Sequence, residues 1–185
     1  MKYIYIFLIF FVSLINSKQV NGDDNLILSL KEGGKIIFIR HALAPGNGDP
    51  ENFNIYDCST QRNLDQKGIQ QAKKIGNFFK SNNISIENVY SSEWCRCKDT
   101  ANYAFSKFKT FDALNSFYDE KFNKFKKIQK KDLRKYIKEW NGNKNLILVT
   151  HYVVILEMLN KPVSSGEIVV SNKKYKIIGS INTLF

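Results

Sequence analysis

Two runs of consecutive apolar residues predict buried strands. They are Lys35–Ile39 (KIIFI) and Asn145–Thr150 (NLILVT), both rich in isoleucine, leucine or valine. An unbroken apolar run is typical of a strand that is covered on both faces, whereas a half-exposed strand alternates apolar and polar residues. Asn88–Ser91 predicts a third, short strand. Two late segments, Ile168–Val170 and Tyr175–Ile181, predict a hairpin with its turn between them.

The segments between these strands contain helical patterns. Asp65 is a good N-cap, and the apolar residues that follow it share one helix face: Ile69, Ala72, Ile75 and Phe79. Three more helices are predicted over Glu93–Phe105, Lys131–Trp140 and Tyr152–Leu159. Strands that alternate with helices indicate an α/β layer fold with a mostly parallel sheet.

The N-terminal segment, residues 1–22, predicts a secretory signal peptide that is removed. Its apolar run, Tyr3–Ile15, is too short to span a bilayer comfortably and has the length of a signal h-region. Ser17 and Gly22 are small residues suited to cleavage, although no A-x-A site is present, which leaves an uncleaved membrane anchor as the alternative. We therefore expect one domain over residues 23–185 and a periplasmic or secreted location.

The chain is basic, with 28 Lys and Arg against 17 Asp and Glu and a formal net charge of +11. Much of the excess lies in Lys121–Lys138. A solvated helix face is the simpler interpretation of such a run, and attraction to an anionic substrate or an anionic membrane surface is the sharper one. No recognition motif accompanies the charge, so we expect no nucleic-acid partner and a monomeric protein.

The three cysteines are Cys58, Cys95 and Cys97. An exported chain folds under oxidising conditions, so we expect a disulfide. Cys95 and Cys97 are poorly placed to bridge each other, which leaves Cys58 to pair with either of them. A zinc site of three cysteines and a histidine is the alternative, but the paired C-x-x-C spacing typical of such sites is missing.

Both histidines of the chain directly follow a predicted buried strand. His41 comes after KIIFIR and His151 after NLILVT, so both should lie at carboxyl ends of strands, where open α/β sheets place their binding sites. Arg40 precedes His41, and Arg96 lies in the first turn of a predicted helix. The helix dipole disfavours a cation at that position, and an anion beside Arg96 would explain it.

Two arginines and two imidazoles suit the chemistry of a phosphoryl group. Arginine binds its oxygens as a forked, permanently charged donor, and a neutral imidazole can attack phosphorus to form a covalent intermediate. Neighbouring cations keep such an imidazole unprotonated. No carboxylate cluster suited to magnesium is evident, since the pair Asp23–Asp24 directly follows the signal segment. We therefore expect metal-free phosphohistidine chemistry with no cofactor.

Four sequence blocks resemble those of the histidine phosphatase superfamily, which includes the cofactor-dependent phosphoglycerate mutases. Arg40–Ala42 resembles the signature R-H-G, and Asn63–Ala72 (NLDQKGIQQA) resembles L-[ST]-x-x-G-x-x-Q-A. Ser91–Ala101 (SSEWCRCKDTA) and Leu148–His151 (LVTH) are similar to the blocks with the second arginine and the second histidine. With R-H-A-x-A-P-G-x-G-D-P and Ser165–Val170 (SGEIVV), the chain looks most like a group of exported bacterial members.

The resemblance implies a phosphoglycerate mutase-like, three-layer α/β/α sandwich. His41 would be the nucleophile that becomes phosphorylated, and Arg40, Arg96 and His151 would complete the phosphate pocket. Asn47 stands where mutase-like members place a further phosphate contact. The expected activity is that of a metal-independent phosphatase of the histidine acid phosphatase type, acting on a small-molecule or surface phosphomonoester. A phosphate-binding protein of the same fold without turnover is the alternative.

The sequence departs from the family pattern at two points. Ala42 replaces the glycine of R-H-G, which could change how the backbone approaches phosphate. The two positions at which members place a general acid hold Ser116 and Tyr152. Nearby carboxylates that could serve instead are Asp119, Glu120 and Glu93.

Overall fold

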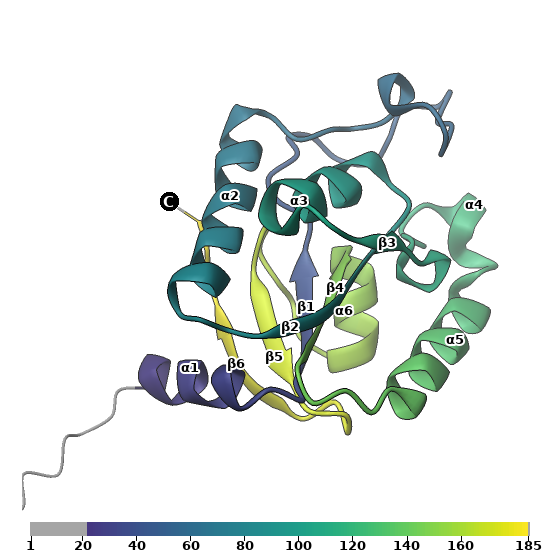
Figure 1. Cartoon of the computed structure of the whole chain (residues 1–185). Coiled ribbons are helices and arrows are strands. Elements are labelled where there is room, and N and C mark those ends of the chain that lie inside the picture. Colours follow the sequence, from purple (N-terminus) through teal and green to yellow (C-terminus); the bar gives the residue numbers. More distant parts are fainter. Residues whose placement is uncertain (1–21, 185) are drawn as a thin grey trace, which may run out of the picture.

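The structure, a computed structural model, describes residues 22–184. The predicted signal segment, residues 1–22, lies outside this range except for Gly22. A six-stranded sheet forms the centre of the described part, with the strand order β3-β2-β4-β1-β5-β6 (Figure 1). The strands are β1 (Ile36–Arg40), β2 (Ile86–Ser91), β3 (Lys109–Thr110), β4 (Asn145–Thr150), β5 (Ile168–Ser171) and β6 (Ile177–Ile181).

The sheet is mostly parallel, as predicted. β3, β2, β4 and β1 run parallel to one another, while β5 is antiparallel to both β1 and β6. The late strands β5 and β6 form the predicted hairpin. The helices are α1 (Gly22–Glu32), α2 (Gln66–Ser81), α3 (Cys95–Phe105), α4 (Glu120–Asn123), α5 (Lys126–Glu139) and α6 (Tyr152–Leu159), with short 3-10 turns η1 (Cys58–Thr60) and η2 (Asp112–Leu114).

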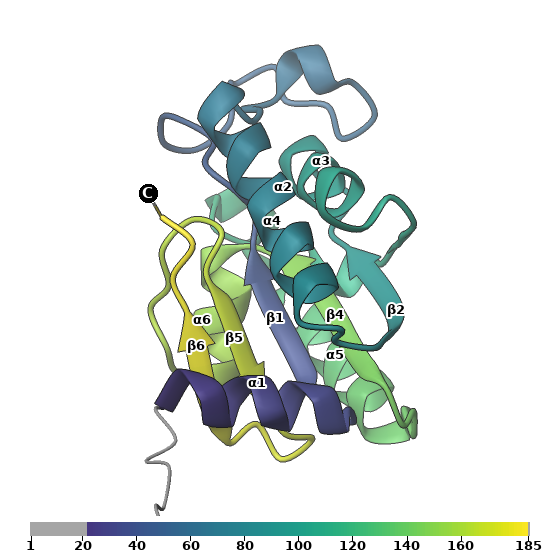
Figure 2. The same ribbon diagram turned by 60° about the vertical axis from the view of Figure 1, so that its left-hand side comes forward.

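Helices cover both faces of the sheet, which explains the unbroken apolar runs. In β1, Ile37 and Ile39 pack into a core cluster shared with α1, α2 and α3. Ile36 and Phe38 point into the opposite cluster, which α5 and α6 complete. Figures 1 and 2 show the resulting three layers. No helix of residues 22–184 is long and apolar enough to cross a membrane.

All four predicted helices are present; α6 has the predicted bounds, whereas α3 and α5 differ from the prediction at their ends. The Asp65 side chain caps α2 by accepting a hydrogen bond from Gly68 N at 2.7 Å. The helix predicted from Lys131 begins earlier, at Lys126. The sequence did not reveal this start, because the first turn is mostly basic and shows no apolar stripe. α1 was not predicted; it buries Leu26 and Leu30 against the sheet.

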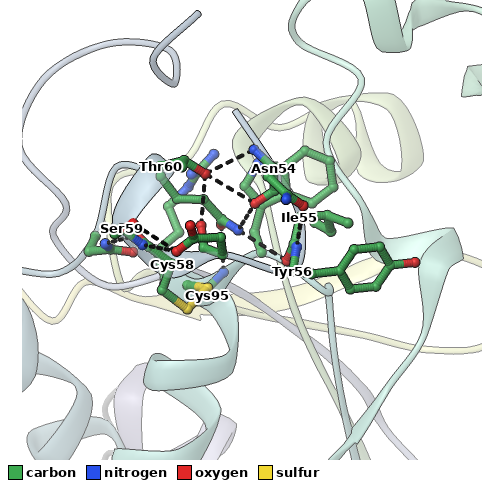
Figure 3. The surroundings of a disulfide bond; sticks show 12 residues. Asn54, Ile55, Tyr56, Cys58, Ser59, Thr60 and Cys95 are labelled. Carbon is green, nitrogen blue, oxygen red and sulfur yellow. Dashed lines mark hydrogen bonds between the residues drawn. A yellow bond between two sulfur atoms is a disulfide. The ribbon is translucent and has the colours of Figure 1, made fainter. Parts of the chain in front are cut away.

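A disulfide between Cys58 and Cys95 anchors the long loop after β1 to the start of α3, with the two Cα atoms 5.7 Å apart (Figure 3). Cys97 is a buried free thiol. The bridge decides between the two predicted pairings. It also contradicts the zinc alternative, since two of the three thiols are oxidised; residues 22–184 contain no group of three metal-ligating side chains.

The loop beside the disulfide is braced by its own hydrogen bonds. Thr60 Oγ1 accepts from Asn54 N at 2.9 Å and donates to Asp57 O at 2.8 Å (Figure 3). Gln61 Nε2 donates to Asn54 O at 3.0 Å, and Gln61 Oε1 accepts from Cys95 N at 2.9 Å. The loop therefore has a fixed position over the N-terminus of α3.

Candidate active site

The pairing of β1 with β4 brings the two histidines together. Arg40 lies opposite Thr150 in the parallel register, and His41 N donates to Thr150 O at 2.9 Å. His41 and His151 are both buried, and their ring centroids are 5.5 Å apart. The adjacent carboxyl ends of two strands thus create one site.

The hydrogen bonding of His41 determines which ring nitrogen carries the lone pair of the neutral imidazole. Its Nδ1 lies 2.8 Å from Ala42 O, and a carbonyl oxygen can only accept, so Nδ1 carries the proton. The neutral ring then has its lone pair on Nε2. Burial lowers the pKa of His41 well below its ordinary value, and the charges of Arg96, Arg40 and Arg62 add to this effect, against the hydrogen bond to Ala42. His41 is therefore a neutral base near pH 7.

The backbone after His41 is held by α3 and α2. Ala42 N donates to Thr100 Oγ1 at 2.9 Å, and Leu43 N donates to Gln71 Oε1 at 2.9 Å. Ala42 is fully buried and is not among the described non-glycine residues with a positive φ. The backbone conformation at this position therefore does not require the glycine of R-H-G.

Gly68 permits this close approach of α2. A Cβ atom at Gly68 would lie only 2.0 Å from Leu43 O, so any larger side chain would push the loop away from the helix. The glycine in NLDQKGIQQA therefore has a steric role in placing the residues that follow His41.

A hydrogen-bond chain also fixes the tautomer of His151. Asn115 Oδ1 accepts from Glu93 N at 2.8 Å and from Ser92 Oγ at 3.0 Å. Because Ser92 has one hydroxyl proton, its oxygen must accept from His151 Nε2, which lies 2.9 Å away. The neutral ring then has its lone pair on Nδ1. Burial and the nearby charge of Arg96 lower the pKa of His151 well below its ordinary value.

Arg96 holds an internal carboxylate. Its Nη1 lies 2.7 Å from Asp49 Oδ1 and its Nη2 lies 3.1 Å from Asp49 Oδ2. Asp49 also accepts from Trp94 Nε1 at 3.1 Å and from Arg62 N at 3.0 Å. Burial alone would raise the pKa of Asp49, but these hydrogen bonds lower it overall. The anion predicted beside Arg96 is therefore supplied by the chain itself.

Arg62 belongs to the site and was missed from the sequence. Its Nε donates to Gly48 O at 2.8 Å and its Nη1 donates to Ala44 O. The composition contains a signal that could have revealed it: arginine is rare in this chain, with only four among the 28 basic residues. Three of the four line one pocket with both histidines, namely Arg40, Arg62 and Arg96.

Two of these arginines have a buried N–H group without a hydrogen-bond partner among residues 22–184. Arg40 Nη1 donates to Val163 O at 2.8 Å, and its guanidinium lies 5.5 Å from the centroid of the Tyr152 ring. Among residues 22–184, Arg40 Nε and Arg96 Nε are buried and find no hydrogen-bond partner. Buried donors are rarely left unpaired, and both arginines line the pocket that also contains the two histidines.

The family model of the histidine phosphatase superfamily (branch 1) matches residues 36–147, more than half of the chain. The chain belongs to this superfamily. His151 lies just outside the matched range, but the pairing of β4 with β1 places it beside His41. No curated protein matches the sequence.

Solved structures of the superfamily fold align over most of the chain. The protein histidine phosphatase SixA, complexed with tungstate, aligns with a TM-score of 0.57 at 14% identity, over 80% of this chain and 97% of that chain. A phosphoglycerate mutase from Thermus thermophilus gives 0.57 at 14%, over 80% and 98%. A phosphoserine phosphatase from Entamoeba histolytica gives 0.52 at 18%, over 74% and 89%. These likenesses show the phosphoglycerate mutase-like fold that was expected.

The pocket of this superfamily member contains some of the predicted residues and not others. Asn47 lines it, on the loop that also carries Asp49. Of the three candidate acids, Asp119 lines the pocket. Glu93 accepts a hydrogen bond from Asn115 Nδ2 at 2.6 Å and faces a neighbouring groove, while Glu120 lines a separate hollow.

Proposed function

We propose that the protein is a metal-independent phosphatase that hydrolyses phosphomonoesters through a phosphohistidine at His41. One observation carries this proposal: the bond from His41 Nδ1 to Ala42 O leaves Nε2 as a neutral nucleophile in a pocket lined by three arginines. An imidazole in this state can attack phosphorus directly. The activities in the names of the structural neighbours, a protein histidine phosphatase and a phosphoserine phosphatase, agree with it.

The phosphate is held by charge and by the unpaired donors. Arg40, Arg62 and Arg96 surround its oxygens with positive charge, and Asn47 completes the pocket. The buried, unpaired Nε–H groups of Arg40 and Arg96 are candidate donors to it. Burial and the arginine charges lower the pKa of His151, and the negative charge of a bound phosphate would oppose that effect and favour the protonated ring. Protonated His151 then donates from Nδ1 to the phosphate.

The reaction has two displacements at phosphorus. His41 Nε2 forms a bond to phosphorus while the ester P–O bond breaks, and its electron pair leaves with the alcohol oxygen, which takes a proton from Asp119. A water molecule then attacks the phosphohistidine and gives a proton to the Asp119 carboxylate. The P–N bond breaks, its electron pair returns to Nε2, and phosphate is released.

Asp119 is the proton donor of choice because of its position. Besides Asp49, it is the carboxylate among the residues that line the pocket, and Asp49 is already engaged by four hydrogen bonds. Asp119 Oδ1 accepts from Lys121 N at 3.1 Å as the N-cap of α4, and Oδ2 lies 3.6 Å from Lys121 Nζ. The side chain is exposed, so the lone pairs that these contacts leave unused are open to a leaving oxygen.

The experiment measures hydrolysis of para-nitrophenyl phosphate by the native protein and by His41→Ala. The enzyme would be supported if the native protein turns the ester over and His41→Ala abolishes this turnover. Mass spectrometry should also detect an acid-labile phosphate adduct on His41 of the native protein. Tight binding of inorganic phosphate without turnover of any ester would favour the alternative, a phosphate-binding protein.

The role of Asp119 has a separate test based on the leaving group. Asp119→Asn should slow hydrolysis of alkyl phosphates by about 100-fold, because an alkoxide needs protonation to leave. It should affect para-nitrophenyl phosphate much less, since nitrophenolate leaves unprotonated. Glu120→Gln is the matched control, and an equal effect of both variants on both substrates would exclude this role.

We further propose that the protein acts outside the cytoplasm, on a small-molecule or surface phosphomonoester. A disulfide agrees with an oxidising compartment. The basic hollow along α5, lined by Lys126, Lys127, Lys130, Lys131 and Arg134 against Glu157, agrees with contact to an anionic membrane surface. Cell fractionation tests the location, and salt-sensitive sedimentation with phosphatidylglycerol vesicles tests the contact.

A further inference from the structure

A second, larger groove adjoins the phosphate pocket. The two share Trp94, Ser116 and Phe122 in their walls. The groove has a volume of about 820 Å³, against about 160 Å³ for the pocket. A phosphomonoester bound at His41 would thus have room for its phosphate in the pocket and for its alcohol part in the groove.

The wall between pocket and groove is aromatic. Phe53 stacks on Trp94 with ring centroids 5.1 Å apart, and Phe122 meets both rings edge-on at 5.5 and 5.4 Å. Trp94 also packs edge-on against His151 at 5.3 Å. The aromatic wall therefore begins at the catalytic histidines and continues into the groove.

The charge of the groove is opposite to that of the protein. Four carboxylates line it, those of Glu51, Glu93, Asp112 and Asp132, against one cation, Lys121. Within residues 22–184, the side chains of Glu51, Asp112 and Asp132 form no ion pair and no hydrogen bond. Three carboxylates without a protein partner thus line one groove of a chain whose formal net charge is +11.

Lys121 shows where a cation can lie in this groove. Its Nζ lies 5.4 Å from the centroid of Phe53 and 5.2 Å from that of Phe122. An ammonium over aromatic faces is attracted by the ring quadrupoles, and surrounding carboxylates add to the attraction. Aromatic rings together with carboxylates are the groups that recognise primary and quaternary ammonium ions.

We infer that the groove binds the leaving alcohol of the substrate and selects alcohols that carry a positive charge, such as an amino alcohol or a quaternary ammonium alcohol. This inference rests on the proposed phosphatase function and adds its substrate class. The arginine pocket takes the phosphate and the acidic aromatic groove takes the ammonium. On cleavage, the alcohol leaves with the proton from Asp119 and the phosphoryl group stays on His41.

The test compares phosphocholine with its neutral carbon isostere, in which a quaternary carbon replaces the nitrogen. The two esters have the same shape and differ in one charge. Native protein should hydrolyse phosphocholine with a kcat/KM about tenfold higher than that of the isostere. The His41→Ala variant, which cannot turn either ester over, should show the same preference in calorimetric Kd values.

Variants locate the preference in the groove. Asp132→Asn should reduce it about threefold, because one attractive charge is lost. Glu139→Gln, which removes a carboxylate from the same helix outside the groove, should leave it unchanged. Lys121→Gln should increase the preference, since it removes the competing cation. Inhibition by inorganic phosphate normalises each variant for its phosphate pocket.

The outcomes separate the two proposals. Equal kcat/KM and equal Kd values for the two esters would overturn the inference while leaving the phosphatase intact. A preference in Kd without turnover of any ester would support the cation-selective groove and overturn the proposed function. A preference that Asp132→Asn and Glu139→Gln reduce equally would assign it to overall charge and reject the groove.

Discussion

Arg96 and Asp49 form a buried, bidentate ion pair in the site. The two N–O distances are 2.7 and 3.1 Å, and the side chains are 4% and 11% exposed. Asp49 occupies both terminal nitrogens of Arg96, whereas Arg96 Nε has no hydrogen-bond partner among residues 22–184. The pair also joins the loop after β1 to α3. Asp49 therefore orients an arginine that would otherwise be free to rotate.

Replacing Asp49 by Asn should cost about 3 kcal/mol in the free energy of unfolding, because the Arg96 charge stays buried without its partner. Urea denaturation of the native and variant proteins measures this difference. Asp119→Asn removes an exposed carboxylate from the same pocket and should change stability by less than about 1 kcal/mol. A similar small change for Asp49→Asn would show that the pair is not structurally important.

The buried histidines should make stability depend on pH. Both have a pKa well below that of the unfolded chain, about 6.5, so the unfolded state binds more protons as the pH falls. Stability should be fully present above pH 6.5 and decline on acidification, by up to about 1.4 kcal/mol per pH unit for each histidine. Melting temperatures between about pH 7 and 5 measure the slope. His151→Asn should flatten it, and an unchanged slope would assign the effect to other groups.

Gly68→Ala distinguishes helix propensity from steric fit. Alanine is the better helix former by about 1 kcal/mol, but its Cβ would lie 2.0 Å from Leu43 O. Since a backbone atom must move, we expect net destabilisation of about 2 kcal/mol and reduced turnover. Asn77→Ala, at an exposed position of the same helix, should be neutral or stabilising. Stabilisation by both substitutions would contradict the steric role.

Thiol labelling should give different counts in three states. The folded, oxidised protein should react slowly, because Cys97 is buried and burial raises its pKa to about 12. Unfolding without reductant should expose one thiol, and unfolding with reductant should expose three. Three thiols without reductant would refute the bridge. Reduction of the folded protein should cost about 4 kcal/mol, given the separation of 37 residues.

The pattern of apolar residues predicted the central strands and α2. A strand buried on both faces is an unbroken apolar run, and a helix buried on one face has an apolar stripe. The pattern was insufficient for α1, where Leu26 and Leu30 are the buried apolar anchors, and for the start of α5, whose residues are mainly solvated. A local sequence pattern therefore predicts a helix or strand only where the element buries many apolar side chains.

The histidines and Arg96 could be placed from strand ends and motifs, but their partners could not. Asp49 and Arg62 reach the site from an irregular loop, and neither periodicity nor strand order predicts where such a loop turns. Their positions depend on tertiary contacts, including the disulfide and the hydrogen bond from Trp94 Nε1 to Asp49. The rarity of arginine in a lysine-rich chain is a signal that could have pointed to Arg62.

The arginines give the pocket a positive charge that does not depend on a change of their protonation state. Burial lowers the pKa of Arg40 and Arg62, yet a guanidinium stays charged under physiological conditions. The positive charge that Arg40 and Arg62 bring to the pocket therefore does not change with pH under physiological conditions. In the proposed mechanism, the imidazoles and Asp119 exchange protons, whereas the arginines supply a charge that does not titrate, so the two tasks fall to different side chains.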